Sequence, residues 1–170
     1  MHIGLIGGIG VAATIVYYQR LTAEVAGRGK TLDLTIDHSD IQTLIGNFEA
    51  GRKAEQAKVY ARHIDRLKAA GCDCAAITSL GGHFCFAETR AMSSLPLVSA
   101  VTPLDAYFAG EGLKRIGLLG TRHVMHSRLY GELTKTQAIA LDDRLDEIGG
   151  AYQDMAVSGH CTEEQRRLCL

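Results

Sequence analysis

The chain has 170 residues, of which 46% are hydrophobic and 22% charged, values typical of a globular protein rather than a disordered or fibrous one. Its formal net charge of −1 gives no electrostatic reason to expect a nucleic-acid partner or binding to an anionic membrane surface. No apolar run approaches the roughly 20 residues that a membrane-spanning helix needs, and no basic segment precedes the apolar N-terminus. We therefore expect neither a membrane protein nor a signal peptide.

The first hundred residues alternate short apolar strands with helical patterns. Strands are predicted at 3–6, 32–36, 74–77 and 97–101, and helices at 12–26, 50–70 and 84–92. In the first helix Ile15 and Val16 belong to the apolar face, and Gly27 is the expected C-cap. In the second, Ile64 and Leu67 are expected to face the core. Strands joined through helices predict parallel βαβ units with right-handed crossovers.

The pattern then starts again. The letters IGLLGT, which begin at Ile116, repeat the letters IGLIGG, which begin at Ile3, and a helix-like segment with a tyrosine follows each. Coincidence is one explanation, because strand-to-glycine turns are common in α/β proteins. The other is a protein of two related α/β domains, 1–102 and 113–170, of which the second is incomplete in this chain.

Three segments follow predicted strands and would lie at the carboxyl edge of a parallel sheet, where ligands bind. They are 7–10, 78–83 and 120–122. The first is not G-x-G-x-x-G, so it does not favour a dinucleotide. Backbone amides in these loops, together with Arg122, would suit a small carboxylate. The alternative is that the glycines only make tight turns.

Within these loops several polar residues allow two interpretations. Ser79 could act in catalysis or could cap the helix after it, and it lies outside any G-x-S-x-G motif. His83 could be a base, but a histidine in the first turn of a helix is more often structural. His38, Ser39 and Asp40 could face a substrate, or Asp40 could cap a helix, which we favour.

Cysteine and histidine positions argue against disulfides and metals. The five cysteines are an odd number without C-x-x-C spacing, which favours buried reduced thiols. The seven histidines lack the spacings typical of metal sites. We expect no bound metal.

Taken together, these blocks resemble the aspartate/glutamate racemase family. The similar segments are IGLIGGI at 3–9 with Thr14, Tyr17 and Tyr18 behind it, His38 to Asp40, the block from Ala70 to His83, and GTRHVM at 120–125 with Tyr130. They occur in the family's order and span essentially the whole chain.

The resemblance implies a cofactor-independent, cytoplasmic isomerase, a homodimer, with two related α/β domains and an active site in the cleft between them. Its substrate would be a small amino acid or dicarboxylate. Two acid/base residues, usually cysteines, invert the α-carbon by removing a proton from one face and returning one to the other. Such chemistry needs paired bases and dense hydrogen bonding to the carboxylate.

Carried over residue by residue, the first catalytic cysteine falls on Ser79. The substrate-binding positions fall on Gly8, Ile9, Leu80, Gly81, His83 and Thr121. Leu80 and Gly81 replace the family's Asn-Thr pair, and Ile9 replaces a methionine. This half of the predicted site has therefore lost polar groups.

The second catalytic cysteine of the family lies in a Gly-Cys-Thr-Glu motif. Cys161, Thr162 and Glu163 match it in letters only, because no apolar strand precedes them. We predict instead that Thr162 caps a helix over 163–168, and that the second cysteine would fall beyond Leu170. A chain impaired in racemisation is expected; the alternative is a non-catalytic homologue that binds a small carboxylate. Hydantoin racemase and maleate isomerase relatives rank lower.

Overall fold

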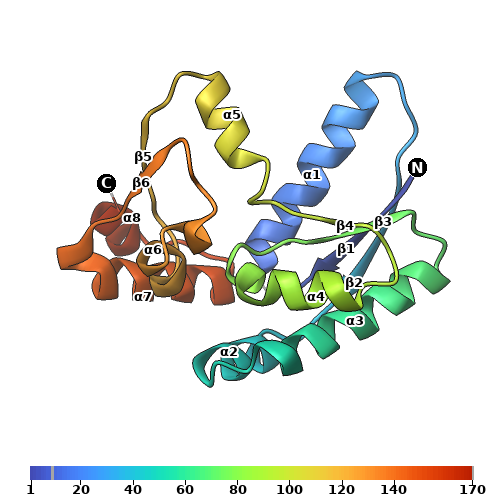
Figure 1. Ribbon diagram of the computed structural model, residues 1–170, viewed down its shortest axis with the longest axis horizontal. Helices are drawn as coiled ribbons and strands as arrows, with labels where there is room; N and C mark the ends of the chain where they lie inside the picture. Colours follow the sequence, from blue (N-terminus) through green and yellow to red (C-terminus); the bar gives the residue numbers. More distant parts are fainter. Residues whose placement is uncertain (9, 170) are drawn as a thin grey trace. The chain divides into compact units, whose positions relative to one another are not determined.

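The computed structural model describes residues 1–8 and 10–169 (Figure 1). The chain divides into two compact units, Met1–Ser99 and Ala100–Leu170. Both contain helices and a parallel sheet, which confirms the predicted α/β class. The domain ranges 1–102 and 113–170 stay predictions, because a division into compact units does not test whether two related domains are present.

The first unit is built on a four-stranded parallel sheet. Its strands are β1 (His2–Gly7), β2 (Asp33–His38), β3 (Cys74–Ile77) and β4 (Leu97–Val98), in the order β2-β1-β3-β4. The apolar β1 is central and pairs with β2 and β3. The predicted fourth strand was too long, because pairing with β3 extends over only two positions.

One face of this sheet is covered by α3 (Lys53–Ala69), which packs against β1, β2 and β3. Ile64 and Leu67 have no exposed surface, as their spacing predicted. The helix predicted over 50–70 begins at Lys53, three residues later than expected. A separate α2 (Ile41–Glu49) precedes it.

The predicted helix at 84–92 is divided. A 3₁₀ turn, η1 (Gly81–Cys85), leads into α4 (Phe86–Met92), which packs against α3. In Figure 1 α2, α3 and α4 are drawn together on one side of the strands.

The helix α1 (Val11–Gly27) forms where its periodicity predicted, but it is poorly covered. None of its residues is buried, and Ile15 and Val16 are 50% and 43% exposed. Its C-cap is Arg28 rather than Gly27, and Gly29 takes the left-handed conformation with φ of 64°. A shallow groove runs along α1, and its lining contains none of the predicted site residues.

The second unit contains α5 (Leu104–Gly110), β5 (Arg115–Gly117), α6 (Arg122–His126), η2 (Leu129–Gly131), β6 (Gln137–Ile139), η3 (Asp142–Arg144), α7 (Leu145–Ser158) and α8 (Glu163–Cys169). The strands β5 and β6 pair in parallel. One apolar cluster holds Val101, Leu118, Val124 and Leu129, and a second holds Met125, Ala140 and Ile148. In the part of the chain that the structure describes, no helix is long and apolar enough to span a membrane.

Candidate functional site

The carboxyl ends of three adjacent strands bring three predicted loops together in the first unit. Gly7 pairs with His38, and Ile6 pairs with Ile77. Beyond the strands, the Ser39 N–H donates to the Gly7 carbonyl at 2.8 Å, and the Thr78 N–H donates to the Ile6 carbonyl at 3.1 Å. The segments that start at Gly8, Ser39 and Thr78 therefore lie side by side on the ligand-binding edge of the sheet.

At this edge of the sheet, position 8 accepts only glycine. Its φ is 86°, and a Cβ atom there would collide with the Ser39 carbonyl oxygen and would lie 2.7 Å from the His38 ring. The turn thus brings the backbone of the β1 loop against the end of β2. Ile9, the next predicted binding residue, lies outside the described residues.

Two threonine hydroxyls fix this turn to the end of β3. The Thr78 hydroxyl donates to the Ile6 carbonyl at 3.0 Å and contacts the Thr14 hydroxyl at 2.8 Å, and the Thr14 hydroxyl also has the Gly10 carbonyl as an acceptor at 3.2 Å. The Gly8 N–H makes a longer 3.4 Å contact to the same Thr14 oxygen. Because Thr78 directly precedes Ser79, these hydrogen bonds also fix the position of the Ser79 backbone.

Ser79 is partly exposed, while His83 is buried. The His83 Nδ1 lies 2.8 Å from the Ser79 carbonyl oxygen, which can only accept, so Nδ1 carries a proton. The His83 ring also stacks on Phe86 with centroids 5.0 Å apart. His83 thus orients the Ser79 backbone. The Ser79 hydroxyl makes a long 3.4 Å contact with the Gly82 N–H, which is a weak cap of the following turn.

A thiol near Ser79 does not replace the missing catalytic cysteine. Cys85 has no exposed surface, and burial raises the pKa of its thiol to about 11. Its sulfur lies 3.6 Å from the Thr89 hydroxyl. Cys85 is therefore a protonated core residue at neutral pH.

The backbone at Leu80 and Gly81 does not exclude the family's Asn and Thr. Leu80 is 38% exposed and has ordinary right-handed helical angles, φ −64° and ψ −37°. A Cβ atom on Gly81 would lie 3.5 Å from the Ser79 Oγ, an ordinary contact distance. Both positions can therefore hold polar side chains without backbone strain.

The segment after β2 is a helix start, as we favoured. Asp40 caps α2, and its carboxylate accepts from the Thr43 N–H and hydroxyl, both at 2.7 Å. These hydrogen bonds lower the pKa of Asp40. Ser39 is only 1% exposed, and its hydroxyl has no hydrogen-bond partner among the described residues.

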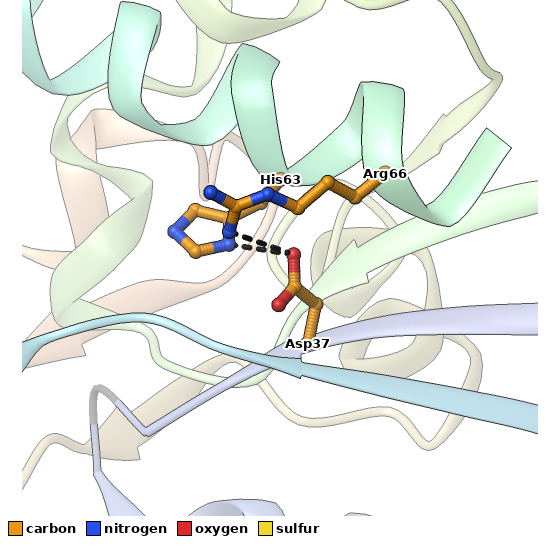
Figure 2. Close-up of polar contacts among 3 residues, drawn as sticks. All are labelled: Asp37, His63 and Arg66. Carbon is orange, nitrogen blue, oxygen red and sulfur yellow. Dashed lines mark hydrogen bonds and ion pairs between the residues drawn. The ribbon is translucent and has the colours of Figure 1, made fainter. Parts of the chain in front are cut away.

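Just before this segment, α3 is joined to β2 by the side chains of Asp37, His63 and Arg66. The Asp37 carboxylate lies 2.8 Å from His63 Nδ1 and 3.5 Å from Arg66 Nη1, as Figure 2 shows. Because a carboxylate only accepts, His63 Nδ1 carries the proton in this contact. Arg66 is mostly exposed, and its contact with Asp37 is the weaker of the two. The Asp37–His63 contact joins the C-terminal end of β2 to α3.

In the second unit, Thr121 precedes α6, is half-buried and makes no side-chain cap. Arg122, expected to hold a carboxylate, pairs with Asp146 through Nε at 3.1 Å.

Cys161 is exposed. Thr162 caps α8, because its hydroxyl accepts from the Gln165 N–H at 3.2 Å while the Gln165 side chain accepts from the Thr162 N–H at 2.8 Å. This confirms the predicted helix start.

The catalytic role of Ser79 and the binding roles of Gly8, Leu80, Gly81, His83 and Thr121 stay predictions. Sequence reasoning missed two residues that build the edge, His63 and Asp37, and it included Thr78 only as the start of the segment 78–83. Asp37 and Thr78 each stand at the carboxyl end of a predicted strand, which was the available signal. No cluster of three His, Cys, Asp or Glu side chains that could hold a metal occurs among the described residues.

Comparison with known proteins identifies the scaffold. A proposed Asp/Glu racemase from Yersinia pestis superposes with a TM-score of 0.78 at 24% identity, covering 98% of this chain and 76% of that one. An aspartate racemase homologue from Pyrococcus horikoshii gives 0.70 at 22% identity, covering 94% and 73%. Picrophilus torridus aspartate racemase gives 0.68 at 17% identity, covering 94% and 76%. At these identities the likeness establishes the fold alone.

The sequence comparison is more specific. No curated protein sequence matches the chain significantly. The sequence profile of the Asp/Glu/hydantoin racemase family, however, matches residues 6–165. Since this match spans nearly the whole chain, the protein belongs to the Asp/Glu/hydantoin racemase family.

Proposed function

We propose that this protein is an aspartate/glutamate-type amino-acid racemase in which the Ser79 hydroxyl stands at one of the two acid/base positions. The observation that carries this is the position of Ser79 two residues beyond β3, with its backbone held by His83 and by the Thr14–Thr78 pair. Gly8 and the loop 79–83 would bind the substrate carboxylate. A cytoplasmic homodimer that needs no cofactor remains a prediction of the family resemblance.

A hydroxyl at this position predicts slow chemistry. An alkyl hydroxyl loses its proton several pKa units less readily than a thiol, whose ordinary pKa is about 8.5. The α-proton of an amino acid is weakly acidic, so the base strongly affects the rate.

The alternative is a protein that binds a small carboxylate without turning it over. The exposed Leu80 and the glycine at 81 favour it, because these positions supply no side-chain hydrogen bond to a carboxylate. Binding of aspartate or glutamate without any exchange would identify this function.

The test is α-proton exchange in D₂O, followed by NMR, for both enantiomers of aspartate and glutamate. Ser79→Ala should lower the rate by about 10²-fold, the usual contribution of a positioned acid or base. Ser79→Cys should raise it. The triple change Ser79→Cys, Leu80→Asn and Gly81→Thr should raise the exchange rate further, because it adds side chains that can hydrogen-bond the substrate carboxylate.

A control is Cys161→Ser, which alters an exposed cysteine to which we give no role and should leave the exchange rate as it is. If neither the native chain nor any Ser79 variant exchanges the proton, the racemase proposal is wrong. Saturable binding in that case would leave the carboxylate-binding function.

A further inference from the structure

The helix α1 leaves apolar residues uncovered in the first unit. None of its residues is buried, whereas α3, which Figure 1 shows on the opposite side of the strands, buries its inner face. A groove runs along α1 over residues 16–28. Because a helix of a globular protein normally buries its apolar residues, exposed ones along a groove indicate a surface for a partner.

Four residues form one stripe along this surface. Val16, Arg20, Ala23 and Gly27 follow one another at intervals of four, three and four positions, so they lie on one face of the helix. Val16 is 43% exposed, and the other three are exposed as well. A Cβ atom on Gly27 would meet nothing within 4 Å. The stripe therefore has a projecting apolar side chain at one end and an open position at the other.

Opposite charges lie along the same groove. Glu24 pairs with Arg28 on the next turn of the helix, at 2.6 Å. Arg20 is exposed and forms no ion pair within the part of the chain that the structure describes. A partner that covers the groove would therefore place a negative group beside Arg20 and a positive one beside Glu24.

A second copy of α1 meets these requirements. A two-fold axis perpendicular to a helix makes the two helices antiparallel and places residues at equal distances from the axis opposite each other. With the axis near position 22, Arg20 of each copy lies beside Glu24 of the other, and Val16 of each copy lies over Gly27 of the other. The small side chain of Ala23 and the bare backbone of Gly27 allow a close approach of the two helices.

We propose that α1 is the interface of a dimer, in which the stripe of one chain packs antiparallel on the stripe of a second copy and Arg20 pairs with Glu24 across the contact. A partner of different sequence would not require this symmetry about the centre of the helix. The inference goes beyond the proposed function, because the groove contains none of the predicted site residues. One helix from each copy buries less area than a standard interface, so we expect a Kd of about 1–100 μM.

The test is the molar mass of the chain in solution, measured by sedimentation equilibrium from about 1 μM to about 1 mM. The mass of the native chain should rise from that of one chain to that of two. Arg20→Glu and Glu24→Arg should each raise the Kd at least about tenfold, because each change opposes like charges at both symmetric contacts. Gly27→Leu should also raise the Kd, since the added side chain takes the space of Val16 from the other copy.

Mixing the two charge variants tests the antiparallel arrangement directly. In a mixed pair, the Arg20→Glu copy carries acidic side chains at both positions and the Glu24→Arg copy carries basic ones, so both contacts join opposite charges again. An equimolar mixture should therefore form heterodimers with a Kd near that of the native chain. The control is Arg62→Glu, which reverses an exposed charge on α3 and should leave the Kd as it is.

Three results would overturn the proposal. They are a native chain that stays monomeric over the whole range, a dimer whose Kd is the same in Arg20→Glu and Glu24→Arg, and a mixture of these variants that does not associate. Circular dichroism verifies that each variant is folded. If a charge variant does not fold, Gly27→Leu decides the question, because its side chain meets nothing within its own chain.

Discussion

At the scale of single residues, Asp105 organises a connection in the second unit. Its carboxylate accepts from the Thr134 hydroxyl at 2.7 Å and from the N–H groups of Lys135 and Thr136 at 3.0 and 3.2 Å. These hydrogen bonds, with the Thr134 hydroxyl contributing most, lower the pKa of Asp105 from its ordinary value of 3.8 to about 2. One side chain thereby fixes the approach to β6.

This pKa predicts acid sensitivity. Because the unfolded chain holds the Asp105 proton more tightly than the folded one, the stabilisation is complete above about pH 4 and is lost as the pH falls toward about 2. Asp105→Asn should lower the Tm of the second unit by several degrees at pH 7 and remove part of its pH dependence between pH 4 and 2. Thermal unfolding followed by hydrogen exchange of residues 100–170 measures this. Asp143→Asn, at an exposed residue without a side-chain partner among the described residues, is the control; an equal effect there contradicts the prediction.

Single residues also mark the limit of what the sequence could predict about the site. Asp40 and Thr162 were recognisable as caps because their partners, Thr43 and Gln165, are three residues away. The Thr14–Thr78 hydrogen bond joins residues 64 apart, and no local pattern encodes it. The edge of the sheet was predictable, whereas the hydrogen bonds that fix it depend on tertiary packing.

At the scale of elements, hydrophobic periodicity predicted where helices form better than it predicted how deeply their apolar faces are buried. The spacing in α3 correctly placed Ile64 and Leu67 in the core. A comparable spacing in α1 predicted a helix, but Ile15 stays half exposed. The physical reason is that a 3.6-residue period reports the face of a helix, while burial depends on what packs against that face.

The crossing of α6 and α7 depends on a glycine that no sequence pattern singled out. A Cβ atom on Gly149 would lie 2.5 Å from the Arg122 Cγ and 2.8 Å from its backbone nitrogen, so the helices approach too closely for a side chain. On Gly150 it would meet only the end of the Arg122 side chain, at 3.2 Å from Nη2. The two glycines therefore differ in what surrounds them.

Gly149→Ala should destabilise the second unit by about 1–3 kcal/mol, because overpacking outweighs the better helix propensity of alanine. Gly150→Ala should be neutral or stabilising by up to about 1 kcal/mol, since the Arg122 side chain can move. Urea unfolding of both variants checks this. Equal effects at the two positions would show that the close approach to Arg122 is unimportant.

At the scale of the whole molecule, the alternation of strands and helices was sufficient to predict parallel α/β architecture, because helical crossovers impose parallel pairing. The repeat of IGLIGG at Ile116 correctly located β5 as a new strand. Strand lengths were less predictable: β4 has two residues and β5 three, since pairing partners far along the chain set where a strand ends.

Each compact unit has its own buried core, and the cores differ in size. Met1–Ser99 contains a four-stranded sheet, and Ala100–Leu170 a two-stranded one. Smaller units bury a smaller fraction of their surface and are less stable. We therefore expect residues 100–170 to lose hydrogen-exchange protection at a lower urea concentration than residues 1–99.

Matched core truncations test this expectation. Ile64 and Ile148 are both fully buried, the first in α3 and the second in α7, and either change to alanine should cost about 2–5 kcal/mol. In hydrogen exchange measured across a urea series, Ile64→Ala should lower the unfolding midpoint of peptides from the first unit, and Ile148→Ala that of peptides from the second. If each variant shifted all peptides by the same amount, the chain would unfold as one cooperative body. In that case the stability of the carboxyl edge around Ser79 would depend on the core around Ile148 as well as on its own.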